Sequence, residues 1–252
     1  MERLTHTEII AIANQKGGVS KTTTAIHLAA GLANKGFKVL GIDLDAQRNF
    51  SYCFNLDTEG LTVYDILTGN AQAAQTTQKR GKGYFIPASK KLSFKGASER
   101  LTAQALKAAL EPIKKDFDFI IIDTPPTRSD YTLNALAAAD KLIITAQPDI
   151  FSLQGIEELT ETYHAVKSIN SKLEIAGILL TRYNGRTVAT REYTELFRLI
   201  ANRLGTTIFN TTIRESVTVK EAQGNRQTLF DYAPKANVTK DYLQFVSEII
   251  ER

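Results

Sequence analysis

The 252-residue sequence has one cysteine (Cys53), no tryptophan and three histidines. A single cysteine excludes an internal disulfide and a four-cysteine metal site. His6, His27 and His164 lie far apart and lack ligand-type neighbours, so we assign them no role. No apolar run approaches the roughly 18 residues that a membrane span needs, and no signal-peptide pattern precedes the first apolar run. We therefore expect a cytoplasmic protein in which Cys53 is simply packed.

The charge is mildly positive, with a net value of +4, but it is clustered. Residues 79–100 contain seven basic residues against one acid, and residues 182–226 contain eight against four. Clustered basic charge is typical of a surface that binds a polyanion such as DNA. An ordinary solvated surface is the alternative.

Hydrophobic periodicity predicts one α/β domain over residues 1–252. The expected strands are 9–13, 37–45, 84–87, 118–123, 141–146, 173–180 and 206–213. Helices are expected at 25–34, 61–67, 97–113, 129–139, 152–169, 191–204 and 238–252, and residues 70–83 are expected to form a loop. Strands alternating with helices predict a doubly wound, mainly parallel sheet with helices on both faces.

A glycine-containing loop joins the first strand to the first helix. Its sequence is Gln15-Lys16-Gly17-Gly18-Val19-Ser20-Lys21-Thr22-Thr23. Glycines allow backbone N–H groups to converge on an anion, and the helix N-terminus adds partial positive charge. The loop lacks the ordinary G-x-x-x-x-G-K-[ST] pattern, because Gln15 and Ser20 stand where its glycines belong, but it fits K-G-G-x-x-K-T-[ST]. A solvated Gly-Gly turn is the alternative.

Acidic residues end two of the predicted strands. Asp43 and Asp45 lie at alternate positions of one strand end, so they point to the same face. Asp123 ends the apolar strand that precedes Thr124-Pro125-Pro126, which is the Walker B arrangement for a magnesium-binding acid. The carboxyl ends of parallel strands form the edge where ligands bind.

These motifs together resemble those of the ParA/MinD-type ATPases. The loop is similar to their deviant Walker A motif, and residues 14–19 resemble the ParA branch. The segment 43–47 resembles D-x-D-P-Q with Ala46 in place of proline, and 123–126 resembles D-[TC]-P-P. The resemblance covers nearly the whole chain and implies a P-loop NTPase that uses ATP and Mg²⁺, in a short form without an N-terminal DNA-binding extension.

The resemblance also implies residue roles. Lys21 would contact the β- and γ-phosphates, Thr22 and Asp123 would hold Mg²⁺, and Asp45 would orient the attacking water. Lys16 would reach the ATP of a partner subunit, which implies a homodimer that forms on ATP binding. The remaining cofactor-binding residues implied are Gly17, Gly18, Val19, Ser20, Thr23 (on the α-phosphate), Asp43 (in support), Asp149 (on the ribose or the signature lysine), and Thr181 and Arg182 (at the base).

The implied function is plasmid or chromosome partition. Such an ATPase binds nonspecific DNA, becomes nucleoid-associated when ATP-bound, and works with a ParB-type partner. Arg186 is the leading DNA-contact candidate, and the further candidates are Arg214, Lys220 and Arg226. Arg214 replaces the usual proline and Thr218 replaces a basic residue of the relatives' pattern, so this set of contacts is loosely defined.

Two other functions stay open, and a third is excluded. In a MinD-like membrane regulator we would expect Lys and Arg on the polar side of residues 238–252. That side instead carries Asp241, Glu248 and Glu251. A switch with little hydrolysis is suggested by Ser20, because a positive φ there costs on the order of 1–3 kcal/mol and weakens ATP binding roughly 5- to 150-fold. Iron–sulfur reductases are excluded, because one cysteine per subunit cannot supply two ligands.

Overall fold

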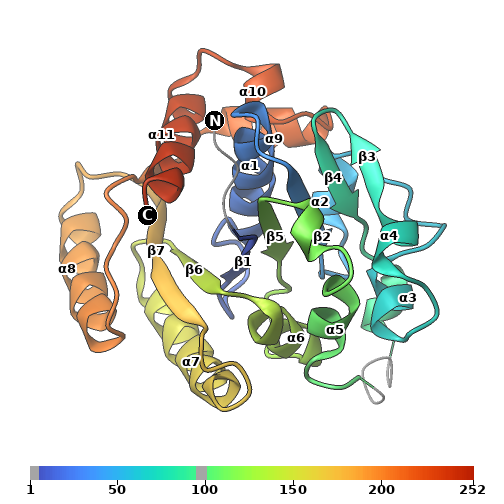
Figure 1. Ribbon diagram of the computed structural model, residues 1–252. Coiled ribbons are helices and arrows are strands. Elements are labelled where there is room, and N and C mark those ends of the chain that lie inside the picture. The colour runs from blue at the N-terminus through green and yellow to red at the C-terminus, as the bar shows by residue number, and fades with distance from the viewer. Residues whose placement is uncertain (1–5, 95–100) are drawn as a thin grey trace.

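The computed structural model describes residues 6–94 and 101–252, which form a sheet covered by helices on both faces (Figure 1). Neighbouring strands of the sheet are parallel except for the antiparallel pair β3–β4. The predicted fold class is confirmed. In spatial order the strands are β3 (Gln78–Arg80), β4 (Gly83–Ile86), β2 (Val39–Asp43), β5 (Phe119–Asp123), β1 (Glu8–Ala13), β6 (Lys141–Ala146), β7 (Glu174–Tyr183) and β8 (Ile213–Arg214).

The helices divide between two apolar cores because strand side chains alternate between the two faces. In β1, Ile9 and Ala11 face one core, whereas Ile10 and Ile12 face the other. The first core packs against α3 (Val63–Leu67), α4 (Ala73–Thr76), α5 (Ala105–Leu110), α6 (Asp130–Ala138), α7 (Ile150–Lys167) and α8 (Val188–Arg203). The second packs against α1 (Lys21–Asn34), α2 (Asn49–Cys53), α9 (Val217–Gly224), α10 (Leu229–Tyr232) and α11 (Asn237–Ile250).

Two predicted segments differ from the structure. Residues 70–83 are not a loop, because they contain α4 and β3, an edge strand whose polar sequence Gln78-Lys79-Arg80 carries no hydrophobic alternation. The strand predicted at 206–213 is reduced to an isolated bridge at Ile208 and the two residues of β8. In both places hydrophobic periodicity is a poor guide, because the segment lies at an edge of the sheet.

Three predicted helix boundaries also shift. The helix predicted at 97–113 is shorter, since α5 spans 105–110 and buries Leu106 and Leu110; residues 97–100 lie outside the described residues. Helix α7 begins at Ile150, not at 152, after its cap Asp149, which accepts from the Ser152 N–H. Helix α8 begins at Val188 after its cap Thr187, not at Arg191. Short 3₁₀ helices cover Lys90–Ser93 and Lys114–Asp116.

Helix α11 docks on the domain, as expected. Its apolar side chains Tyr242, Phe245 and Val246 are buried in the second core, next to α1. Two of its acids are used internally: Asp241 pairs with Arg214 and Glu248 with Arg252. Within the described part of the chain, no helix has both the length and the apolarity that crossing a bilayer would take.

Candidate nucleotide-binding site

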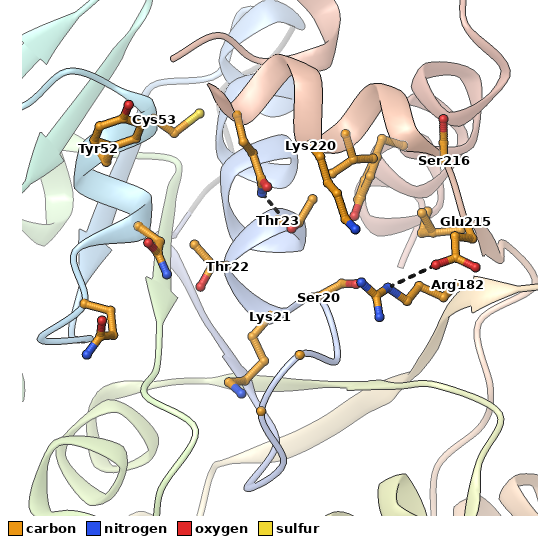
Figure 2. Close-up of a pocket in the computed structure, with 18 of the residues that line it drawn as sticks. Ser20, Lys21, Thr22, Thr23, Tyr52, Cys53, Arg182, Glu215, Ser216 and Lys220 are labelled. Atoms are coloured by element: carbon orange, nitrogen blue, oxygen red, sulfur yellow. Dashed lines mark hydrogen bonds and ion pairs between the residues drawn. The ribbon is translucent and has the colours of Figure 1, made fainter. Parts of the chain in front are cut away.

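The three predicted motifs meet at one edge of the sheet. The parallel register places Asp123 beside Asp43 on one side and beside Ile12 on the other, one residue before the end of β1. A cavity of about 600 Å³ opens at this edge. It lies between α2, which carries Tyr52 and Cys53, and the α9 segment with Lys220, with the loop at its base (Figure 2).

The glycine-containing loop is held in a fixed conformation. Gly18 has φ 79° and Ser20 has φ 65°, so the serine does adopt the left-handed conformation that was considered for it. The Gln147 side chain donates to the Gly18 carbonyl (2.6 Å), and the Thr181 hydroxyl donates to the Val19 carbonyl (3.3 Å). These contacts, from the residue after β6 and from β7, support the loop, which favours a preformed anion site.

Lys21 is buried at the start of α1. Its Nζ donates to the Lys16 carbonyl (2.8 Å), closing the loop on itself. Burial lowers the pKa of Lys21 to about 8, against the opposing effect of Asp123 and Asp45. A bound phosphate would stabilise the charged form of this buried ammonium by supplying an opposite charge.

Asp123 meets the requirement for a magnesium-binding acid. It is fully buried, and neither carboxylate oxygen has a hydrogen-bond partner among the described residues. Burial, followed by repulsion from Asp43, raises the pKa of Asp123 well above its usual value. The Thr22 hydroxyl faces it and opposes that rise, although the two groups fall short of hydrogen-bond geometry. A buried carboxylate with open oxygens beside a threonine hydroxyl fits a hydrated Mg²⁺.

The two acids at the end of β2 have different positions. Asp45 lines the cavity, and its Oδ1 accepts from the Gln47 N–H (2.9 Å). Asp43 does not line it, because its oxygens accept from Asp45 N–H (3.0 Å) and from the N–H and hydroxyl of Ser51 (2.9 and 2.7 Å). Burial raises the pKa of Asp43 to about 6. In the structure Asp43 holds Asp45 and α2 in place, which is a supporting part in the site.

Lys16 directly precedes Gly17, which lines the cavity, and pairs with Asp149. Its Nζ is 2.7 and 2.8 Å from the two carboxylate oxygens, and 5.3 Å from the centre of the Phe151 ring. Burial acts to raise the pKa of Asp149, but Lys16 and the Ser152 N–H outweigh it and the pKa lies below its usual value. Of the two roles considered for Asp149, the structure has the contact with the signature lysine.

Of the two residues predicted to contact the base, one lines the cavity and the other does not. Arg182 lines the cavity, with its Nε 3.8 Å from Glu215. Thr181 does not line it: the side chain is fully buried, and its hydroxyl bonds to the Val19 and Ala146 carbonyls. In the structure the Thr181 hydroxyl supports the loop, and its contact with adenine stays a prediction.

The four predicted DNA-contact residues are dispersed. Arg214 and Lys220 line the cavity, and Arg214 pairs with Asp241 at 2.7 Å. Arg226 stacks on Tyr52, with its guanidinium 4.3 Å from the ring centre. Arg186 is exposed in the loop between β7 and α8.

Sequence analysis missed several residues around the cavity. Gln223 donates to the Thr23 hydroxyl (3.1 Å), Gln147 holds Gly18, and Tyr52 and Asn49 line the cavity from α2. The only available signal was that residues 49–53 closely follow Asp45. Nothing local marks Gln147 or Gln223, since both reach the loop from distant parts of the chain.

Comparison with known proteins identifies the family. Residues 7–175 match the AAA domain family. The chain is 37% identical to the chromosome-partitioning ATPase Soj of Treponema pallidum, over 96% of this chain and 97% of that protein. It is 35% identical to the chromosome partitioning protein ParA of Caulobacter vibrioides, over 97% and 94%. The chain belongs to the ParA-type family of partition ATPases. The resemblance to the ParA-type family that the sequence motifs indicated is confirmed.

A solved structure supports the nucleotide interpretation of the ParA-type cavity. The chain matches cobyrinic acid a,c-diamide synthase of Mycobacterium smegmatis with bound ADP and magnesium at a TM-score of 0.80 and 28% identity. The match covers 97% of this chain and 94% of that one. The expected cofactors, ATP and Mg²⁺, are thus consistent with both the cavity and the neighbouring fold.

Proposed function

We propose that this ParA-type chain is an ATP-switched partition ATPase. It binds Mg²⁺–ATP, dimerises, binds nonspecific DNA on the nucleoid, and positions a plasmid or chromosome cargo with a ParB-type partner. The observation that carries the proposal is that Lys21 and Asp45 line one cavity, with Asp123 close enough to Lys21 for its charge to act on the pKa of that lysine.

The residues of the loop and of the two strand ends have distinct tasks in hydrolysis. The loop amides and Lys21 bind the phosphates, and Thr22 with Asp123 would hold Mg²⁺, which neutralises developing phosphate charge. Asp45 accepts a hydrogen bond from the attacking water and orients it toward the γ-phosphate. Asp43 keeps Asp45 in place through its backbone N–H.

Lys16 links hydrolysis to dimerisation. In a dimer it would leave Asp149 and place its ammonium on the partner's ATP, as an arginine finger does when supplied in trans. The Asp149 pairing makes that step unfavourable in the monomer. Turnover is therefore slow until a second subunit, and the ParB-type partner, stabilise the dimer.

Dimerisation would also strengthen DNA binding. Arg186, Arg214, Lys220 and Arg226 carry the proposed phosphate contacts, and contacts from two subunits add on one duplex. ATP should therefore raise the affinity for DNA, and added salt should lower it steeply.

The test compares the wild type with Lys16→Ala in binding a random-sequence duplex, with and without ATP, over a salt series. We expect the wild type to bind in an ATP-dependent, salt-sensitive manner and Lys16→Ala to lose the ATP effect. Lys172→Ala, an exposed lysine near the opposite edge of the sheet, is the matched control and should behave as the wild type. Equal ATP-dependent binding by Lys16→Ala would contradict the dimer switch.

A further inference from the structure

A second groove lies behind the nucleotide cavity. It has a volume of about 430 Å³ and is lined by residues of the β3–β4 hairpin and of the turn that connects α9 to α10. Figure 1 shows where these elements lie. Cys53 lines both this groove and the nucleotide cavity, so α2 separates the two spaces.

The charge around this groove is unbalanced. Three cations, Arg80, Lys82 and Arg226, line it against one carboxylate, Asp231. Asp231 accepts from the Thr228 hydroxyl at 2.6 Å. Within residues 6–94 and 101–252, none of these four side chains forms an ion pair. The groove therefore has excess positive charge that the described protein does not neutralise.

The two guanidinium groups, of Arg80 and Arg226, both bond to one neutral residue. Arg80 Nε donates to the Asn55 carbonyl (3.3 Å), and Arg226 donates to the Asn55 side-chain oxygen (2.9 Å). Tyr52 covers the Arg226 guanidinium on one face. Neutral acceptors orient the guanidiniums but do not cancel their repulsion, whereas a bound anion would.

The backbone at the groove consists of two helix ends and one hairpin turn. Asn55 (φ 51°), Gly81 (φ 52°) and Arg226 (φ 53°) are all in the left-handed region, one in each of the three segments that meet here. Asparagine and glycine adopt it readily, but for an arginine this conformation is strained. Asn55 and Arg226 follow the C-caps of α2 and α9, where the Leu56 N–H donates to the Ser51 carbonyl and the Gln227 N–H to the Ala222 carbonyl. Their conformation therefore ends the two helices and places both residues beside the groove.

We propose that this groove binds the phosphodiester backbone of DNA, and that the DNA-contacting surface extends from Arg226 onto Arg80 and Lys82 of the β3–β4 hairpin. Paired guanidiniums bind phosphate oxygens bidentately, and a lysine adds a further phosphate contact. The inference rests on the proposed DNA-binding function, and names a part of the surface which that function does not assign.

The test uses the double variant Arg80→Gln/Lys82→Gln and measures the binding of a fluorescent random-sequence duplex by anisotropy, with Mg²⁺–ATP, from 50 to 200 mM salt. Losing two phosphate contacts should reduce the slope of log affinity against log salt by about 1–2 and weaken binding roughly tenfold or more. Lys107→Gln/Lys115→Gln, with exposed lysines at the opposite edge of the sheet, is the matched control and should retain both values.

Different outcomes overturn different statements. If the wild type binds DNA and the double variant matches its affinity and salt slope, the groove is not a DNA site and the inference is wrong. A wild type that binds no DNA with ATP overturns the proposed function as well. Should the double variant melt at a lower temperature, Lys82→Gln alone replaces it, because that side chain has no hydrogen bond to the described protein; an unchanged slope for it again contradicts the inference.

Discussion

Ser20 combines two properties at the point where the loop enters α1. Its φ of 65° is in the left-handed region, which costs a non-glycine residue on the order of 1–3 kcal/mol. Its side chain also lines the nucleotide cavity, where backbone amides must approach phosphate. The left-handed backbone lowers the free energy of unfolding, whereas the side chain in the cavity affects ATP binding directly.

We expect Ser20→Gly to tighten ATP binding by about fivefold or more, because it removes the side chain from the phosphate cradle and lets the loop adjust freely at positive φ. Calorimetric titration with ATP measures the effect. Ser20→Ala is the matched control, since it keeps Cβ and the strain, and should not tighten binding. An unchanged affinity for Ser20→Gly would show that the serine is tolerated.

The alternative of a switch with little hydrolysis is tested by single-turnover assays. We expect slow hydrolysis in the wild type that DNA increases. No product over many hours, with or without DNA, would favour the switch instead.

His27 is a buried histidine locked in one neutral tautomer. Its Nδ1–H donates to the Thr23 carbonyl (2.7 Å), and its Nε2 accepts from the Leu229 N–H (3.0 Å). Burial lowers the pKa of His27 to about 4, despite the opposing Thr23 carbonyl and Asp231. A proton on Nε2 would face another donor, so the folded state resists protonation.

This histidine should make the fold sensitive to acid. Its pKa is about 6.5 in the unfolded chain and about 4 in the folded protein, so its stabilising contribution is present above pH 6.5 and is lost as the pH falls toward 4. Between pH 7 and pH 5 we expect the wild type to lose about 1–2 kcal/mol more unfolding free energy than His27→Gln. Urea titration measures the difference, and equal losses would contradict it. The variant comparison is needed because Asp43, with its pKa raised to about 6, changes stability in the opposite direction.

At the scale of elements, α7 is the support of the nucleotide loop. A Cβ at Gly155 would lie 2.4 Å from Asn14 Oδ1 and 3.0 Å from Lys16 Cβ. Asn14 in turn accepts from the Lys16 N–H (2.9 Å), and Gln15 donates to Thr162 of α7 (2.7 Å). The glycine thus permits the close approach of helix and loop.

We expect Gly155→Ala to lower unfolding free energy by about 1–3 kcal/mol through overpacking, and to weaken ATP binding because Asn14 and Lys16 must shift. Thermal melting and calorimetry measure the two effects. A lower melting temperature with unchanged ATP affinity would show that α7 packs against the loop without setting its binding geometry.

At the scale of the whole molecule, the helices on the two faces of the sheet contribute differently to the site. The face that carries α1, α2, α9 and α11 surrounds the nucleotide cavity and the basic groove, whereas α7 of the other face supports the loop and the Lys16–Asp149 pair. Helices of both faces contribute to this one site, because it lies at the carboxyl ends of the strands, where the two faces meet.

This arrangement predicts no ATP-dependent membrane binding. The apolar face of α11 is buried in the second core, so exposing it to lipid would require unfolding part of that core. Co-sedimentation with anionic liposomes, with and without ATP, should leave the protein in the supernatant. ATP-dependent pelleting would favour a MinD-like regulator.

The sequence alone determined the sheet, the loop and the acids Asp45 and Asp123. Buried parallel strands are continuous apolar runs, and the residues that follow them lie at one edge of the sheet. Local pattern was therefore sufficient to bring Lys21 and these acids together. It failed where the pattern is polar, as in β3, or very short, as in β8.

Only the tertiary structure decided which side chains meet across the fold. Lys16 and Asp149 are 133 residues apart, and Asn55 and Arg226 are 171 apart. It also showed that Asp43 bonds to Ser51 and Thr181 to Val19, because the contacts of a side chain at a strand end depend on the helices and loops that pack there. Periodicity assigns a residue to an element, whereas packing between elements assigns its contacts.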